Sequence, residues 1–128
     1  KAKVDKMKRR KDILTYGFVN NVDVLMDACN CIITKPGGLS TSEALAKRLP
    51  ILMLDPIPGQ ENRNKEFMLN NGIALNLSET FGADEAIYQL IHYPFKAMRL
   101  SENTQHFAKP HAARDLGEFM LEICSSEE

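Results

Sequence analysis

The chain has 128 residues, of which 44% are hydrophobic and 26% are charged. This composition is ordinary for a globular domain, and a chain of this length can bury a core without disulfides or metal. No run approaches the roughly 20 consecutive apolar residues of a membrane-spanning helix, and no apolar segment follows the basic start as in a secretory signal. We therefore expect a cytoplasmic protein whose three cysteines are reduced.

Charge is balanced overall but not along the chain. Sixteen basic and 17 acidic residues give a net charge of −1, which argues against nucleic acid as a partner. Residues 1–12 carry seven basic and two acidic side chains, so this segment is +5 and the remainder is −6. Two interpretations stay open, namely the solvated end of a helix that begins upstream or a contact with an anionic membrane surface. Because the chain does not begin with Met, we expect part of a longer protein.

Short apolar runs bounded by polar turn residues predict strands that are covered on both faces. These runs are residues 13–19, 31–34, 51–54 and 73–75. Amphipathic segments between them predict helices. Strands that alternate with helices predict βαβ units, so the expected fold class is α/β with a parallel sheet and flanking helices.

The C-terminal third is expected to be helical, because no further strand pattern follows Ser78. Residues 83–91 predict one helix, and a second follows Pro94. A third opens at Pro110 and carries an apolar stripe on one face. The stripe consists of Ala112, Leu116, Phe119, Met120 and Ile123.

The predicted topology also predicts where a ligand binds. In open parallel sheets, ligands bind outside the carboxyl ends of the strands. Three segments follow the first three runs at this edge, and all are rich in Gly, Pro or amide side chains. They are residues 17–21, 35–41 and 55–62.

Loop 35–41 has the features of a phosphate site. Gly37 and Gly38 let backbone N–H groups approach a ligand, and a helix predicted to begin at Ser40 presents unsatisfied N–H groups and a positive dipole end. The structural alternative is a tight turn followed by a capping box, in which Glu43 reaches back to the Ser40 amide. Neither the Walker A pattern nor Gly-x-Gly-x-x-Gly is present.

Loop 55–62 is a stiff turn built from two prolines and a glycine, followed by a predicted helix. The start of that helix carries Gln60, Glu61, Asn62 and Asn64. Amides donate and accept hydrogen bonds and a carboxylate accepts them, which suits the neighbouring hydroxyls of a sugar. The alternative is a helix cap with solvent-exposed polar residues.

Together the two loops resemble the donor-binding signature of the monogalactosyldiacylglycerol synthase and processive diacylglycerol glucosyltransferase family. The resemblance is dense over residues 34–64 and looser from Gly17 to Leu77. It is carried by a phosphate loop, a Glu at a fixed distance and a Pro-Gly-Gln-Glu loop, in that order. It implies a GT-B architecture, with two Rossmann-like domains facing a cleft. More distantly, the pattern is similar to the N-acetylglucosaminyltransferase that completes the peptidoglycan lipid precursor.

The resemblance also implies the site residues. The nucleotide-binding residues are then Phe18, Val19, Gly37, Gly38, Leu39, Ser40, Thr41 and Glu43. The donor-sugar-binding residues are then Gln60, Glu61 and Asn64. Within the first group, Phe18 and Val19 border uracil. Residues 37–41, which we call the glycine loop, hold the diphosphate, and Glu43 binds the ribose hydroxyls. No metal or other cofactor is implied, because the loop and the helix terminus stabilise the charge on the departing diphosphate.

The function implied is a UDP-sugar-dependent inverting glycosyltransferase that transfers a hexose to a diacylglycerol-type lipid, peripheral on the inner face of the membrane. The chain then divides into the basic end of an upstream helix (1–12), a Rossmann-like nucleotide-sugar-binding core (13–91) and C-terminal helices (92–128). The acceptor and the general base would belong to a missing N-terminal domain, so no catalytic residue is assigned and this part alone is expected to be inactive. Two alternatives stay open: a non-catalytic α/β nucleotide-binding or regulatory module, and a glycosyltransferase with a non-lipid acceptor.

Overall fold

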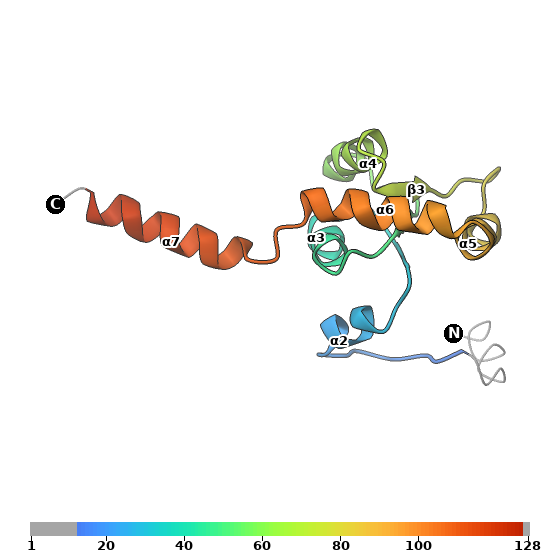
Figure 1. Cartoon of the computed structure of the whole chain (residues 1–128), viewed down its shortest axis with the longest axis horizontal. Coiled ribbons are helices and arrows are strands. Elements are labelled where there is room, and N and C mark those ends of the chain that lie inside the picture. Colours follow the sequence, from blue (N-terminus) through green and yellow to red (C-terminus); the bar gives the residue numbers. More distant parts are fainter. Residues whose placement is uncertain (1–12, 127–128) are drawn as a thin grey trace.

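The computed structural model describes residues 13–126 (Figure 1). The predicted basic helix end at residues 1–12 lies outside the described residues. In chain order the elements are α2 (Val22–Asp27), β1 (Ile32–Thr34), α3 (Gly38–Ala46), β2 (Ile51–Met53), α4 (Gln60–Asn70), β3 (Ala74–Asn76), α5 (Ala83–His92), α6 (Pro94–Phe107) and α7 (Ala112–Ser125).

The strands form one parallel sheet in the order β1-β2-β3, which confirms the predicted α/β class. Ile51 of β2 pairs with Ile32 on one side and with Ala74 on the other. Helices α3 and α4 make the two crossovers between these strands. Because the three strands run in the same direction, their carboxyl ends meet at one edge of the sheet.

The central strand β2 has the core on both of its faces, and all three of its residues are fully buried. Ile51 and Met53 pack with Ala44 of α3 and Met68 of α4. Leu52 points to the other face and packs with Leu77 and with Ala86 of α5. Burial on both faces explains why β2 is a continuous apolar run without alternation.

Residues 13–19 form no strand, contrary to the sequence prediction. This segment extends beside α2, apart from the sheet (Figure 1), and Leu14 is 74% exposed. A strand forms only where its backbone pairs with a neighbour, and residues 13–19 do not pair with the sheet, whose order is β1-β2-β3. The other three predicted strands are confirmed to within a residue at each end.

The three predicted C-terminal helices are confirmed, but they differ in burial. Helix α6 packs on α3 and α5 and buries Leu100 and Thr104. Helix α7 projects away from the body of the molecule (Figure 1) and buries none of its residues among the described part of the chain. The apolar stripe of α7, which includes Leu116 and Phe119, is therefore exposed to solvent here.

Candidate functional site

Two loops lie side by side at the carboxyl edge of the sheet. One connects β1 to α3, and the other connects β2 to α4. The strand ladder continues to this edge, where the Leu54 N–H donates to the Thr34 carbonyl at 2.9 Å. The Leu77 N–H likewise donates to the Met53 carbonyl at 2.8 Å, so the three strand ends are held level.

Helix α3 begins at Gly38 with Gly37 as its N-cap, two residues earlier than the predicted start at Ser40. Its first helical hydrogen bond runs from the Thr41 N–H to the Gly37 carbonyl at 3.2 Å. The N–H groups of Gly38, Leu39 and Ser40 thus precede this bond and have no helical acceptor. These groups and the helix dipole form the kind of terminus that attracts a phosphate.

The structure does not contain the capping box that was the alternative interpretation of this loop, because within the described chain no side chain caps α3. The hydroxyls of the first turn bond to its carbonyl oxygens instead. Thr41 Oγ1 donates to Gly37 O at 2.5 Å and to Gly38 O at 3.2 Å, and Ser42 Oγ donates to Gly38 O at 2.8 Å. Glu43 is exposed on the next turn and, in the part of the chain that the structure describes, accepts no capping hydrogen bond at the helix end.

The loop before α4 is fixed by Gly59 and Glu61. Gly59 is the N-cap and has a φ of 117°, a conformation that side-chain-bearing residues rarely adopt. Glu61 Oε2 accepts a 2.5 Å hydrogen bond from the Ile57 N–H, which holds the turn closed. A Cβ built on Gly37 would lie 3.9 Å from the other oxygen, Glu61 Oε1. One oxygen of the Glu61 carboxylate therefore accepts a hydrogen bond within its own loop, and the other lies next to Gly37 of the glycine loop.

Asn64 joins the two loops directly. Its Nδ2 donates a 2.9 Å hydrogen bond to the carbonyl oxygen of Pro36, 28 residues away. The sequence singled out Asn64 for its amide but did not indicate this partner. Gln60, in contrast, is exposed at the first position of α4.

A small cavity of about 180 Å³ lies between α3 and α4, next to these contacts. Its lining includes Gly38, Thr41, Ser42 and Asn64. Small-molecule sites usually enclose roughly 300–1,000 Å³, so this cavity can take only one group of a larger ligand.

The structure does not bring the two predicted uracil-binding residues to this site. Phe18 is 99% exposed, and the segment that contains Phe18 and Val19 extends beside α2, away from α3 (Figure 1). The predicted residues that do come together are those of the glycine loop, the first turns of α3 and the start of α4.

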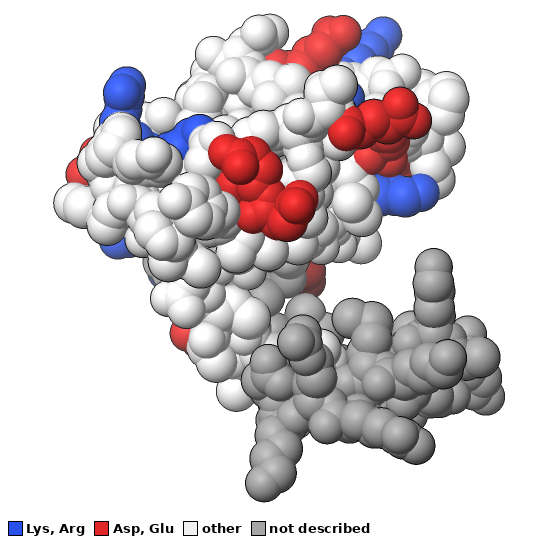
Figure 2. Space-filling model, turned by 90° about the vertical axis from the view of Figure 1, so that its right-hand side faces the viewer, with Lys and Arg blue, Asp and Glu red and all other residues white. Residues whose placement is uncertain are grey.

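Figure 2 shows acidic and basic side chains interspersed on one face of the molecule, without a continuous field of one sign. Across residues 13–126, His, Cys, Asp and Glu side chains form no group of three or more that could hold a metal ion. In the same range, no helix has both the length and the apolar character needed to cross a membrane.

Burial raises the pKa of the Cys31 thiol, and the neighbouring Cys29 thiol adds to the effect. Cys31 immediately precedes β1, so it lies at the amino edge of the sheet, opposite the two loops.

Comparison with known proteins identifies the relatives of the chain. No protein-family model matches it. It is 34% identical over 110 residues to the processive diacylglycerol beta-glucosyltransferase of Bacillus thuringiensis (strain Al Hakam), covering 84% of this chain and 28% of the relative. The protein of the same name from Bacillus cytotoxicus is 32% identical over 107 residues, with the same coverage. A crystal structure of the glycosyltransferase SnogD from Streptomyces nogalater matches 85% of this chain and 33% of its own, with 20% identity and a TM-score of 0.48.

The fold is that of an α/β protein with a parallel sheet, and two loops at the carboxyl edge of this sheet form the candidate site. The chain is a homologue of the processive diacylglycerol beta-glucosyltransferases, as the sequence of its two loops predicted. It spans 28% of the length of these relatives.

Proposed function

We propose that the chain is the donor-binding part of a UDP-sugar-dependent glycosyltransferase with GT-B architecture. In this proposal the whole protein transfers a hexose from UDP-hexose to a diacylglycerol-type lipid with inversion, and it works at the membrane surface. The names of the curated homologues support the reaction class and the lipid acceptor. The donor and the stereochemistry rest on the resemblance of the loops.

The observation that carries the proposal is the hydrogen bond between Asn64 and Pro36. It holds the N-terminus of α3 and the start of α4 together as one surface at the carboxyl edge of the sheet. A sugar nucleotide needs two such neighbouring regions, because its diphosphate and its hexose are directly bonded. We assign the diphosphate to the first turn of α3, the ribose to Glu43 and the hexose to Gln60 and Glu61.

The proposed step is a displacement at the anomeric carbon. The acceptor hydroxyl oxygen bonds to this carbon while the bond to the diphosphate oxygen breaks, and the hydroxyl proton passes to a base outside this chain. Negative charge then grows on the leaving diphosphate. The N–H groups of Gly38, Leu39 and Ser40 and the dipole of α3 are fixed in place to stabilise that charge.

An activity assay on a longer protein that contains this chain tests the proposal. Such a protein should transfer hexose from UDP-hexose to diacylglycerol, whereas the 128 residues alone should show only background transfer. Gln60→Ala should depress turnover yet leave UDP affinity nearly unchanged, because Gln60 orients only the hexose. Asn62→Ala, an exposed neighbour on the same turn, is the matched control. Strong transfer by the 128 residues alone, or equal loss in both variants, would contradict these assignments.

A further inference from the structure

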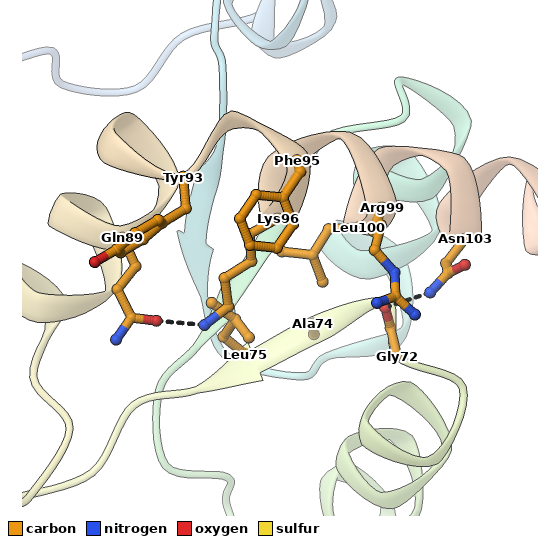
Figure 3. A pocket seen from close by; sticks show the side chains of 10 residues that line it. All are labelled: Gly72, Ala74, Leu75, Gln89, Tyr93, Phe95, Lys96, Arg99, Leu100 and Asn103. Carbon is orange, nitrogen blue, oxygen red and sulfur yellow. Dashed lines mark hydrogen bonds between the residues drawn. The ribbon is translucent and has the colours of Figure 1, made fainter.

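A second cavity, of about 550 Å³, lies between β3, α5 and α6 (Figure 3). Gly72 and Ala74 line it at the amino end of β3, whereas the donor loops follow the carboxyl ends of β1 and β2. The cavity is therefore separate from the proposed donor site. Its volume lies within the roughly 300–1,000 Å³ that small-molecule sites enclose.

The walls of this cavity are mainly apolar. Ala74 and Leu75 of β3 and Leu100 of α6 form its inner part. The rings of Tyr93 and Phe95 stand at its solvent side, with their centroids 6.2 Å apart and an edge-to-face geometry, and Phe95 is 62% exposed. Exposed aromatic rings beside an apolar hollow are typical of a surface that binds a ligand.

Two cations line the same cavity. Lys96 and Arg99 are three residues apart on α6, and both project toward β3 in Figure 3. Neither forms a salt bridge with a carboxylate among residues 13–126. Lys96 Nζ donates to the side-chain oxygen of Gln89, a neutral partner, and lies 5.9 Å from the centroid of the Phe81 ring. The cavity thus carries a charge of +2 with no acidic residue in its lining.

The end of the cavity beside Arg99 is preformed. Asn103 Nδ2 donates a 2.9 Å hydrogen bond to the carbonyl oxygen of Gly72 (Figure 3). Gly72 has a φ of 63°, and a Cβ there would lie only 3.0 Å from Asn103 Nδ2. The left-handed backbone and the close amide favour glycine at this position, and the hydrogen bond links the segment before β3 to α6.

We propose that this cavity binds an anionic lipid, with one acyl chain against the apolar wall and its phosphate headgroup between Lys96 and Arg99. An apolar wall selects a hydrocarbon chain, and two cations that pair with no carboxylate of residues 13–126 select a charged headgroup. Arg99 offers a planar fork of donors that fits phosphate oxygens. An uncharged diacylglycerol would leave both cations without a counter-charge, so this site differs from the acceptor site of the proposed reaction.

The test is a titration of the 128-residue protein, followed by amide NMR, with dodecyl phosphate kept below its micelle concentration. Dodecyl maltoside supplies the same chain with an uncharged headgroup, and inorganic phosphate supplies the anion alone. Dodecyl phosphate should shift the amides of residues 93–103 and bind at least tenfold more tightly than either comparison compound. Lys96→Gln combined with Arg99→Gln should weaken it by about 10-fold or more, as expected for lost hydrogen bonds to a charged group.

Lys109→Gln combined with Arg114→Gln removes the same charge from outside the cavity, so this control should bind dodecyl phosphate like the unaltered protein. Both variants change exposed or partly exposed side chains, and an unchanged melting temperature shows that each is folded. Equal affinity for dodecyl maltoside would overturn the headgroup assignment, and equal affinity for inorganic phosphate would overturn the acyl chain. Shifts confined to α7 would overturn the cavity as the site.

Discussion

The side-chain amide of Asn64 donates a 2.9 Å hydrogen bond to the carbonyl oxygen of Pro36 and so joins the start of α4 to the loop before α3. Pro36 is buried and Asn64 is partly buried, so water competes little for this bond. The bond fixes the spacing between the glycine loop and the Pro-Gly-Gln-Glu loop. In the proposed enzyme this spacing sets the distance between the diphosphate and the hexose.

Asn64→Ala should therefore weaken both stability and UDP binding. Loss of the bond leaves the Pro36 carbonyl unpaired, which costs about 1–3 kcal/mol in the free energy of unfolding. Urea denaturation and calorimetry with UDP measure the two effects. Asn62→Ala, on the exposed side of the same turn, should change neither. Equal effects of the two substitutions would mean that Asn64 does not position the loops.

Gly38→Val should separate ligand binding from folding. A Cβ at Gly38 meets nothing within 4 Å, so the substitution should leave the melting temperature within a few degrees. UDP binding should be lost, because the new methyl groups stand where the diphosphate must approach the first N–H groups of α3. Gly117→Val, which also adds its Cβ to open space but on α7, is the matched control. Unchanged UDP affinity in the Gly38 variant would refute the phosphate assignment.

Gly59→Ala should destabilise the fold by about 1 kcal/mol or more, because its φ of 117° is strained for any residue with a side chain. A Cβ there meets no atom within 4 Å, so the cost comes from the backbone alone. Gly17→Ala, with equally open surroundings and no positive φ, should be close to neutral. Urea denaturation of the two variants gives the comparison, and a neutral Gly59→Ala would show that the loop relaxes freely.

Cys31 should react more slowly with iodoacetamide than Cys29 or Cys124 near pH 8. Partial burial raises the pKa of the Cys31 thiol, and the reactive species is the thiolate. Peptide mass spectrometry over a range of pH should place the rise in Cys31 alkylation at higher pH than that of the two exposed thiols. Alkylation of all three cysteines with one pH profile would contradict this prediction.

The same shift predicts a loss of stability in alkaline solution. The folded thiol of Cys31 keeps its proton to higher pH than the unfolded thiol, so the unfolded state releases its proton first. The contribution of the Cys31 thiol to the free energy of unfolding is therefore complete below the unfolded pKa of about 8.5, and it falls as the pH rises above that value. Cys31→Ala should remove this part of the alkaline loss, as urea denaturation at several pH values would show.

Local sequence patterns predicted the strands that are covered on both faces of the sheet. Ile51, Leu52 and Met53 form a run with no polar position, and such a run fits only a strand that is covered on both faces. Residues 13–19 look similar but form no strand, because pairing depends on a neighbouring edge that a local pattern does not describe.

Within the site, the sequence predicted residue types better than contacts. Ser40 and Glu43 match a capping box, yet Gly37 and Gly38 allow the chain to enter the helix two residues earlier. The amide of Asn64 suited a sugar, but its hydrogen bond to Pro36 joins residues on successive crossovers, a relation that only the packed fold defines.

The central claim, that the glycine loop and the start of α3 bind the diphosphate, is tested most directly by titrating the 128-residue protein with UDP and following its amide NMR spectrum. We predict that the amides of residues 37–43 shift first, with millimolar affinity, which corresponds to about −4 kcal/mol. Uridine, which keeps the ribose but lacks the diphosphate, should leave the amides of residues 37–41 unchanged. Glu43→Ala should weaken UDP binding, while Glu66→Ala, an exposed glutamate on α4, should not. Shifts confined to α6 and α7, or identical shifts with uridine, would contradict the account.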